Sequence, residues 1–136
     1  MRTVVLDNEA VQALANQAHP KHRAVVAHLD ATTTRRRRGR LTDALVPSSV
    51  RVEAGWDRSQ AGSAVLNRFR VQDHPLDRGT SDVAASIVAA TGVSVADAHL
   101  GAAVRSLPST EIVVLSSDPA DMAIVCTPAS VRVVVI

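Results

Sequence analysis

The sequence is poor in aromatic residues and in cysteine. Among its 136 residues there is one tryptophan, Trp56, one phenylalanine, Phe69, and no tyrosine. The chain therefore lacks the stacking platforms of sheet-based single-strand binders, and any grip on nucleic acid would have to be electrostatic. The only cysteine, Cys126, cannot form an internal disulfide and has no cysteine partner for a zinc or iron–sulfur site. This usage agrees with a reducing compartment, and Cys126 is most simply a small core residue.

Long apolar runs are also missing. The longest candidate, Val83 to Val104, is interrupted by Asp97, His99 and several serines and threonines, whereas a membrane span needs about 18 uncharged residues. The apolar part of the start is too short for a secretory signal. We therefore expect a cytoplasmic protein with no membrane partner. A hydrophobic content of 46% in a chain of this length is enough for one globular domain over residues 1–136.

Basic residues are almost all arginine, since Lys21 is the only lysine, and the net charge is a modest +2. The guanidinium fork matches phosphate oxygens, so a cluster of arginines can hold a nucleic-acid backbone. The alternative is a solvated loop whose charge keeps the protein soluble. The sequence leaves both interpretations open for one stretch, TTTRRRRGR, which contains Arg35, Arg36, Arg37, Arg38 and Arg40.

Apolar, β-branched runs alternate along the chain with segments of helical periodicity. Ile112–Leu115 is the strongest strand signal, because it is continuously apolar, as buried parallel strands are. The alternation predicts a three-layer α/β/α sandwich with a mostly parallel five-stranded sheet. We expect strands near residues 3–6, 41–46, 69–73, 112–115 and 131–136, helices near 8–15, 21–31, 47–60, 62–66, 76–91 and 95–106, another helix after 118, and a loop at the arginine stretch.

Two aspartates end two similar strands. Asp7 closes the run Thr3–Leu6, and Asp118 closes the run Ile112–Ser117. Side chains at the carboxyl ends of neighbouring parallel strands point into one crevice, so the two acids can converge. An aspartate at a strand-to-helix junction is also a common helix N-cap, and this alternative is strong for Asp118, which precedes Pro119.

Two further acids lie inside predicted helices and can complete an acidic cluster. Glu53 stands between Val52 and Ala54, where it is either solvated or turned into a site. Asp97 lies among alanine, valine and leucine, and a buried acid needs a partner or a metal. A cluster of carboxylates binds a hard divalent cation, which would make the chain an enzyme acting on phosphate esters.

Four segments together resemble a PIN domain of the VapC type, in order and spacing from residue 3 to residue 136: VVLDNEAVQALA, VPSSVRVEAGWDR, VADAHLGAAV and VVLSSDPADM. The resemblance implies an endoribonuclease that depends on Mg²⁺ or Mn²⁺, usually the toxin of a type II toxin–antitoxin pair. It implies an RNA substrate, a cognate antitoxin whose arginine enters the acidic crevice, and a homodimer with a shared basic surface that the arginine stretch could line. The metal ligands and catalytic residues would be Asp7, Glu53, Asp97 and Asp118, with auxiliary Asn8, Glu9, Ser117 and Asp121.

The chain departs from the family pattern in ways that leave an alternative. Ser94 stands one helical turn before Asp97, where relatives often have another acid, so the metal site would be weaker. The phrase GTSDVAA makes Asp82 a second choice for the position given to Asp97. A PIN-like module that binds RNA or antitoxin with weak or lost catalysis is therefore the second hypothesis. A phosphoacceptor receiver domain is set aside, because it needs a lysine late in the chain and the only one is Lys21.

Overall fold

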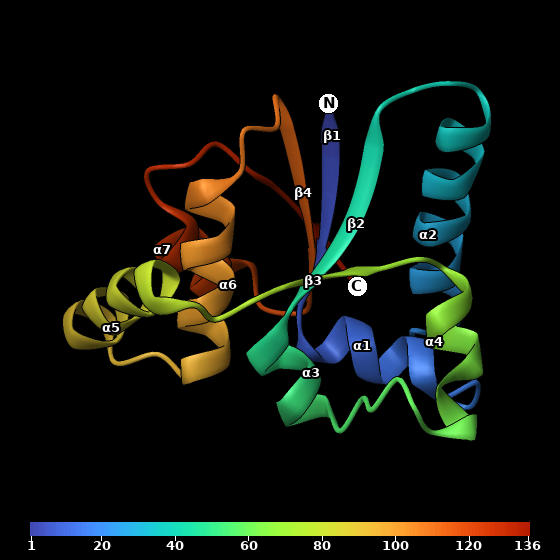
Figure 1. Ribbon diagram of the computed structural model, residues 1–136, viewed down its shortest axis with the longest axis horizontal. Helices are drawn as coiled ribbons and strands as arrows, with labels where there is room; N and C mark the ends of the chain where they lie inside the picture. Colours follow the sequence, from blue (N-terminus) through green and yellow to red (C-terminus); the bar gives the residue numbers. More distant parts are fainter.

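Five parallel strands form one sheet, in the order β3-β2-β1-β4-β5, in a computed structural model that describes residues 1–136 (Figure 1). The two neighbours of the central strand β1 are thus β2 and β4, which lie about 40 and 110 residues further along the chain. The expected α/β fold with a five-stranded, mostly parallel sheet is confirmed. The strands are β1 (Arg2–Leu6), β2 (Thr42–Pro47), β3 (Gln72–His74), β4 (Glu111–Ser116) and β5 (Arg132–Val135).

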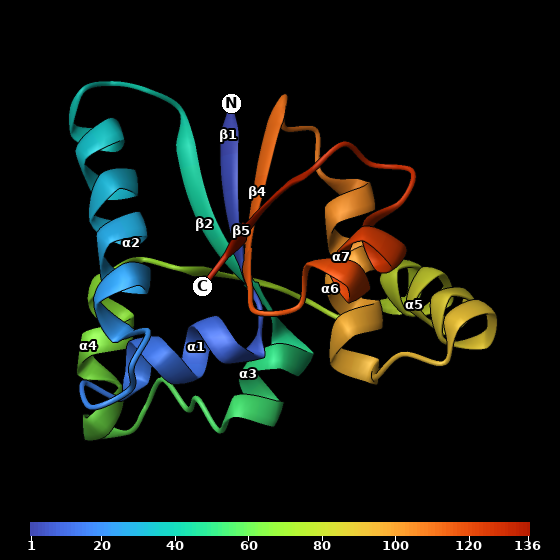
Figure 2. The same ribbon diagram turned by 180° about the vertical axis from the view of Figure 1, so that it is seen from behind.

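Seven α-helices cover the two faces and the carboxyl edge of the sheet (Figures 1 and 2). Helices α2 and α4 lie on one side, α5, α6 and α7 on the other, and α1 and α3 lie below the ends of the strands. No helix combines the length and apolar character that crossing a membrane requires. The helices are α1 (Asn8–Ala15), α2 (His22–Arg37), α3 (Ser48–Ala54), α4 (Ala64–Arg68), α5 (Arg78–Thr91), α6 (Val95–Ser106) and α7 (Pro119–Cys126), with a 3-10 turn at Ala61–Ser63.

The core has two parts because successive residues of a strand point to opposite faces of the sheet. Val4 and Leu6 of β1 pack in a cluster that includes Leu29 of α2. Val5, between them, packs in a second cluster with Met122 of α7. The same alternation extends to Asp7, the residue after β1. Asp7 therefore faces the same side of the sheet as Val5.

Helices α6 and α7 are in close contact at Gly101. A Cβ atom added to Gly101 would lie 2.4 Å from the backbone oxygen of Val125 and 2.8 Å from its Cβ. Only glycine lets the two helix backbones approach this closely. The contact holds the end of α7 against α6.

The arginine stretch departs from its prediction, because Arg35, Arg36 and Arg37 form the last turn of α2 rather than a loop. The preceding threonines are weak helix formers, but the hydroxyls of Thr32 and Thr33 donate to carbonyl oxygens four residues earlier, at 3.0 and 3.2 Å. Cations in the last turn of a helix also favour its C-terminal dipole.

Two other predicted elements have different bounds. Helix α3 ends at Ala54 instead of near residue 60, because Gly55 adopts the left-handed conformation, φ 70°, that terminates helices. Strand β3 begins at Gln72 instead of residue 69, since Arg70 has a positive φ of 53°, which is incompatible with a strand.

Candidate acidic site at the carboxyl edge of the sheet

Asp7 is the buried centre of the acidic site. It follows β1 directly and caps α1, where its carboxylate accepts a hydrogen bond from the Ala10 backbone N–H at 2.9 Å. Only 8% of the residue is exposed. Burial raises the pKa of this carboxyl, with a further rise from Glu9, while hydrogen bonds from Ser116 and Ala10 lower it. The predicted cap is therefore present, and it engages only one of the two carboxylate oxygens.

Ser116 is the candidate site residue that sequence reasoning missed. It is the last residue of β4 and is fully buried. Hydrogen bonding by its side chain lowers the pKa of Asp7, and its hydroxyl oxygen accepts from the Asp118 backbone N–H at 3.0 Å. Ser117, the predicted auxiliary residue, is exposed. The register of the strands places Ser116 beside Asp7, because Val5 pairs with Val114, and two residues further along Asp7 and Ser116 face the same side of the sheet. The sequence alone carries no signal for this register.

Asp97 lies within electrostatic range of the other acids, including Asp7. It lies in the first turn of α6, whose N-cap Ser94 accepts from the Asp97 backbone N–H at 3.1 Å. Burial raises the pKa of its carboxyl, and the negative charges of Asp121, Asp7 and Glu53 raise it further, in that order. Four acids from four separate segments thus interact electrostatically through Asp97. The second-choice residue, Asp82, is exposed on α5.

Asp118 and Asp121 form a pair at the start of α7. Asp118 caps the helix, since its carboxylate accepts from the Asp121 backbone N–H at 3.1 Å. The pKa of Asp121 is raised, first by a side-chain hydrogen bond to Asp118 and then by the charge of that residue. The alternative role foreseen for Asp118, that of a cap, is therefore realised, and Asp121 rather than Asp118 is the main acid of α7 acting on Asp97.

The remaining predicted acids and amides lie at the rim of the site. Glu53 is exposed in the last turn of α3, and its charge reaches Asp97. Glu9 forms an ion pair with Lys21 at 3.5 Å, and Nε2 of His19 lies 3.2 Å from the same carboxylate oxygen. The side-chain oxygen of Asn8 accepts a hydrogen bond from Gln12 on the next turn of α1, so the amide is engaged within its own helix.

His99 lies two residues after Asp97 but belongs to a different contact network. It is fully buried, and its Nδ1 is 2.8 Å from the hydroxyl of Ser49. Its Nε2 is 3.4 Å from Nδ1 of His74. Burial and the neighbouring His74 lower the pKa of the His99 imidazole. The ring therefore ties α6 to the start of α3.

The predicted RNA-binding arginines lie at the opposite end of α2 from α1. Arg35 donates to the Thr42 hydroxyl at 3.1 Å, and Arg36 donates to the Thr42 backbone oxygen at 2.9 Å. These two side chains therefore fasten α2 to the first residue of β2. Arg37, Arg38 and Arg40 are exposed.

The donor set fits a hard divalent cation in its chemistry. All four predicted ligands are carboxylates, the oxygen donors that Mg²⁺ and Mn²⁺ prefer, and the pKa values of Asp7 and Asp97 are raised first by burial, which disfavours their ionised forms. As the side chains stand, no three acidic, histidine or cysteine residues enclose a common point. Glu53 and Asp118 are exposed, whereas Asp7 is buried and Asp97 is half-buried.

No family model matches the chain, and no curated protein matches it in sequence. Two solved structures share its fold over almost the full length of both partners. A crystal structure of VapBC2 from Rickettsia felis, bound to a DNA fragment from its promoter, has a TM-score of 0.59 at 10% identity and covers 97% of this chain and 98% of the other. A structure of FitAB bound to an IR36 DNA fragment also has a TM-score of 0.59, at 17% identity, over 96% and 94%. At these identities the likeness establishes the fold of this chain.

Proposed function

We propose that the protein is a metal-dependent endoribonuclease of PIN type. The observation that carries the proposal is that Asp7 and Asp97, at the starts of α1 and α6, share the carboxyl edge of a parallel sheet with the acids of α3 and α7. The charges of Asp121, Asp7 and Glu53 raise the pKa of Asp97 there, and this edge is where ligands bind in open α/β folds. Acidic residues are seldom gathered and buried without a cationic partner for the sake of packing alone. Here four carboxylates share one edge without a basic residue among the main influences on Asp97.

The acidic residues would have different roles in the site. Asp7, Glu53, Asp97 and Asp118 would hold Mg²⁺ or Mn²⁺, and Asp121 would support them. A bound divalent cation supplies positive charge for the scissile phosphate and acidifies the attacking water. Asp7 is oriented by the hydrogen bond that its carboxylate accepts from the Ala10 backbone N–H at 2.9 Å.

Protonation must be suppressed for this site to bind a cation. The hydroxyl of Ser116 lowers the pKa of Asp7 against the effect of burial, and it thereby favours the ionised form that coordinates metal. A side-chain hydrogen bond with Ser94 lowers the pKa of Asp97 in the same way. The two serines are thus positioning residues that keep buried acids available.

The fold also supports a role in a toxin–antitoxin pair. Both structural neighbours are named as two-component complexes bound to DNA fragments, and one fragment comes from the promoter of the pair. By analogy, we propose a cognate antitoxin that inserts an arginine between the carboxylates. Its guanidinium group would relieve the repulsion between the carboxylates, as a metal ion would. A homodimer is part of the same proposal.

A binding module without catalysis is the second candidate. It is favoured by Ser94, which stands where an extra acid would strengthen the site and is engaged as the N-cap of α6. The protein would then bind RNA or an antitoxin on its surface without hydrolysing RNA.

Cleavage of a labelled RNA pool with Mg²⁺, with Mn²⁺ and with EDTA separates the two candidates. We expect cleavage with either metal, none with EDTA, and a loss of roughly 100-fold or more in Asp7→Asn and Asp97→Asn. Asp82→Asn is the matched control, because it makes the same chemical change on exposed α5. Undiminished cleavage by Asp97→Asn would refute the assignment, and metal-independent RNA binding without cleavage by the native protein would favour the module.

A further inference from the structure

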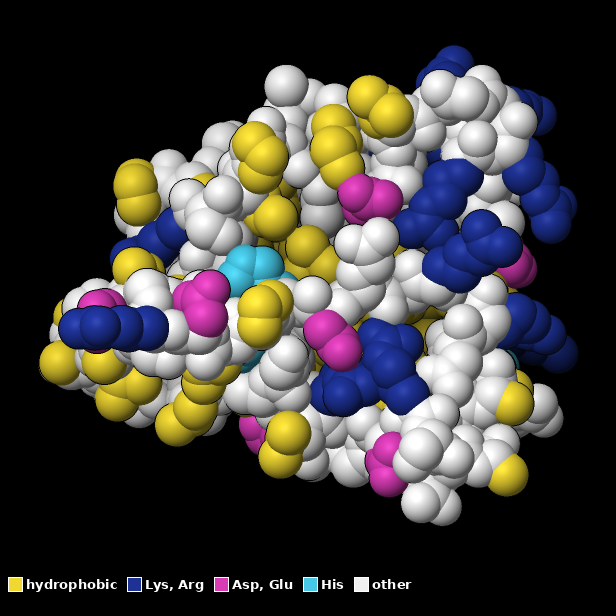
Figure 3. All heavy atoms as spheres, in the orientation of Figure 1, with side chains coloured by type: hydrophobic (Ala, Val, Ile, Leu, Met, Phe, Trp, Pro, Cys, Tyr) yellow, Lys and Arg dark blue, Asp and Glu magenta, His cyan; other side chains and the backbone are white.

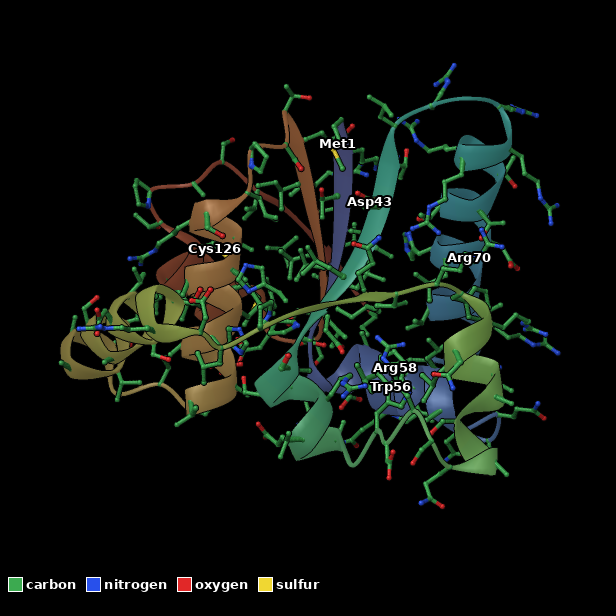
Figure 4. All side chains as sticks on the ribbon, in the orientation of Figure 1. Met1, Asp43, Trp56, Arg58, Arg70 and Cys126 are labelled. Carbon is green, nitrogen blue, oxygen red and sulfur yellow. The ribbon has the colours of Figure 1, made fainter.

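A hollow lined by arginines lies between the last turn of α2 and the connection from α4 to β3. Its volume is about 260 Å³. Basic side chains gather over this side of the molecule in Figure 3, and Figure 4 shows Arg70 on the connection that runs beside α2. The lining residues, which we call the arginine hollow, are Thr33, Arg36, Arg37, Arg68, Phe69 and Arg70.

The four arginines of this hollow have no acidic partner. None of them takes part in any of the ion pairs of the chain. By contrast, Arg51 and Arg58 share the carboxylate of Asp73, at 3.1 Å each. Four like charges around one concave surface repel one another, and an anion placed among them removes that repulsion.

Two of the arginines are held in place by contacts other than ion pairs. Arg36 donates from Nε to the Thr42 carbonyl at 2.9 Å and from Nη1 to the Phe69 carbonyl at 3.4 Å. The guanidinium of Arg68 lies over the Phe69 ring, 5.0 Å from its centre. These contacts fix the cations without neutralising them, which reduces the entropy lost on binding an anion.

Arg70 has an uncommon backbone conformation. Its φ of 53° lies in the left-handed region, and it is the only residue other than glycine with a positive φ. A long side chain in this conformation is disfavoured relative to glycine or asparagine. This backbone conformation brings the charged side chain of Arg70 to the hollow, which it lines.

We propose that the arginine hollow binds a phosphodiester group of RNA, at a backbone contact separate from the acidic site. Guanidinium groups match phosphate oxygens in shape and charge. The only aromatic ring in the hollow, Phe69, is buried beneath Arg68, so the contact is to backbone and independent of base sequence. This inference rests on the RNA substrate of the proposed function.

The two sites lie on different parts of the molecule. Helix α2 has 16 residues and is therefore about 24 Å long, with the hollow at its end and α1, which Asp7 caps, near its start. An RNA that reaches both must span several nucleotides. Short oligonucleotides that occupy only the acidic site should therefore be insensitive to the hollow.

Binding of a labelled 20-nucleotide RNA to the full chain in EDTA tests the contact without cleavage. The variant is Arg37→Gln with Arg70→Asn, because neither side chain makes a hydrogen bond or ion pair and asparagine tolerates the left-handed backbone. The control, Arg23→Gln with Arg78→Gln, removes the same charge from exposed positions on α2 and α5.

We expect the hollow variant to bind about tenfold more weakly, with a salt dependence reduced by about one phosphate contact, and the control to change less than twofold. Equal losses of RNA affinity in the hollow variant and the control would overturn the proposal, and so would the absence of RNA binding by the native chain. Tighter binding of an acidic peptide than of RNA at this surface would also overturn it. Asp97→Asn should bind RNA normally, so a failure of cleavage is distinguishable from a failure of the hollow.

Discussion

Replacement of Asp97 by asparagine should stabilise the protein when no metal is present. The pKa of Asp97 is raised by burial and by three neighbouring acids, which means that its ionised form is disfavoured in the folded state. Asparagine removes the charge and retains an acceptor oxygen, and the helix-capping bond survives because it uses the backbone N–H of this residue.

The size of the effect follows from the repulsion that is relieved. Two unit charges at 4 Å interact with about 1 kcal/mol in water and about 4 kcal/mol near a protein surface. Since Asp97 is only half-buried and solvent screens it, we take the lower figure. In EDTA at pH 7 the variant should be more stable by about 1 kcal/mol, which raises the Tm of a chain of this size by roughly 3–5 °C.

The gain should depend on pH with a definite sign. A carboxyl whose pKa is raised by folding binds its proton more tightly in the folded state, so the native chain loses stability as pH rises from the unfolded pKa, 3.8, through the higher folded one. The asparagine of the variant does not titrate. The difference between variant and native chain should therefore be small below pH 4 and reach its full size near neutrality.

Metal should reverse the order of stability. At a Mg²⁺ or Mn²⁺ concentration of 100 times its Kd, binding stabilises the native chain by about 2.7 kcal/mol, and the variant should gain little. Urea denaturation in EDTA and in Mn²⁺, at several pH values, measures both effects. A variant that is less stable than the native chain in EDTA, or one that responds to Mn²⁺ as strongly, would refute the reasoning.

Three further substitutions or reactions test other parts of the structure. Ser116→Ala removes the hydroxyl that lowers the pKa of Asp7, so cleavage at neutral pH should fall roughly 10–100-fold and the acidic limb of its pH profile should move upward, whereas an unchanged profile would contradict the role. Gly101→Ala places a Cβ against Val125 and should destabilise by about 2–3 kcal/mol in urea. Burial raises the pKa of the Cys126 thiol to about 11, so a thiol reagent at pH 8 should react slowly with the native protein and rapidly in denaturant; fast native reaction would show that α7 opens.

Local capping chemistry made parts of the fold predictable. Helices α1 and α6 have their predicted bounds, because Asp7 and Ser94 are strong N-caps placed directly before the first helical residue. The end of α3 was misplaced although Gly55 stood in the sequence, since the apolar spacing around Trp56 continued the helical pattern. Trp56 instead packs as a buried residue after the helix end, where tertiary contacts outweigh periodicity.

The acidic site was predictable to the extent that topology alone determines it. The carboxyl ends of β1 and β4 are adjacent whenever those strands pair, so Asp7 had to approach the residues that follow β4. The side chain of Ser116 was missed because its importance depends on strand register, which the sequence does not specify residue by residue. The arginine hollow was not predictable either, since Arg70 joins Arg37 only through folding.

The capping bonds of the two strand-end aspartates have a practical consequence for spectroscopy. The amide protons of Ala10 and Asp121 are bonded to the carboxylates of Asp7 and Asp118, so each amide is a built-in sensor of the acid it touches. A cation that draws either carboxylate away would shift that amide resonance and speed its exchange with solvent. Metal occupancy at the two strand ends can therefore be followed separately, without RNA and without altering a single residue.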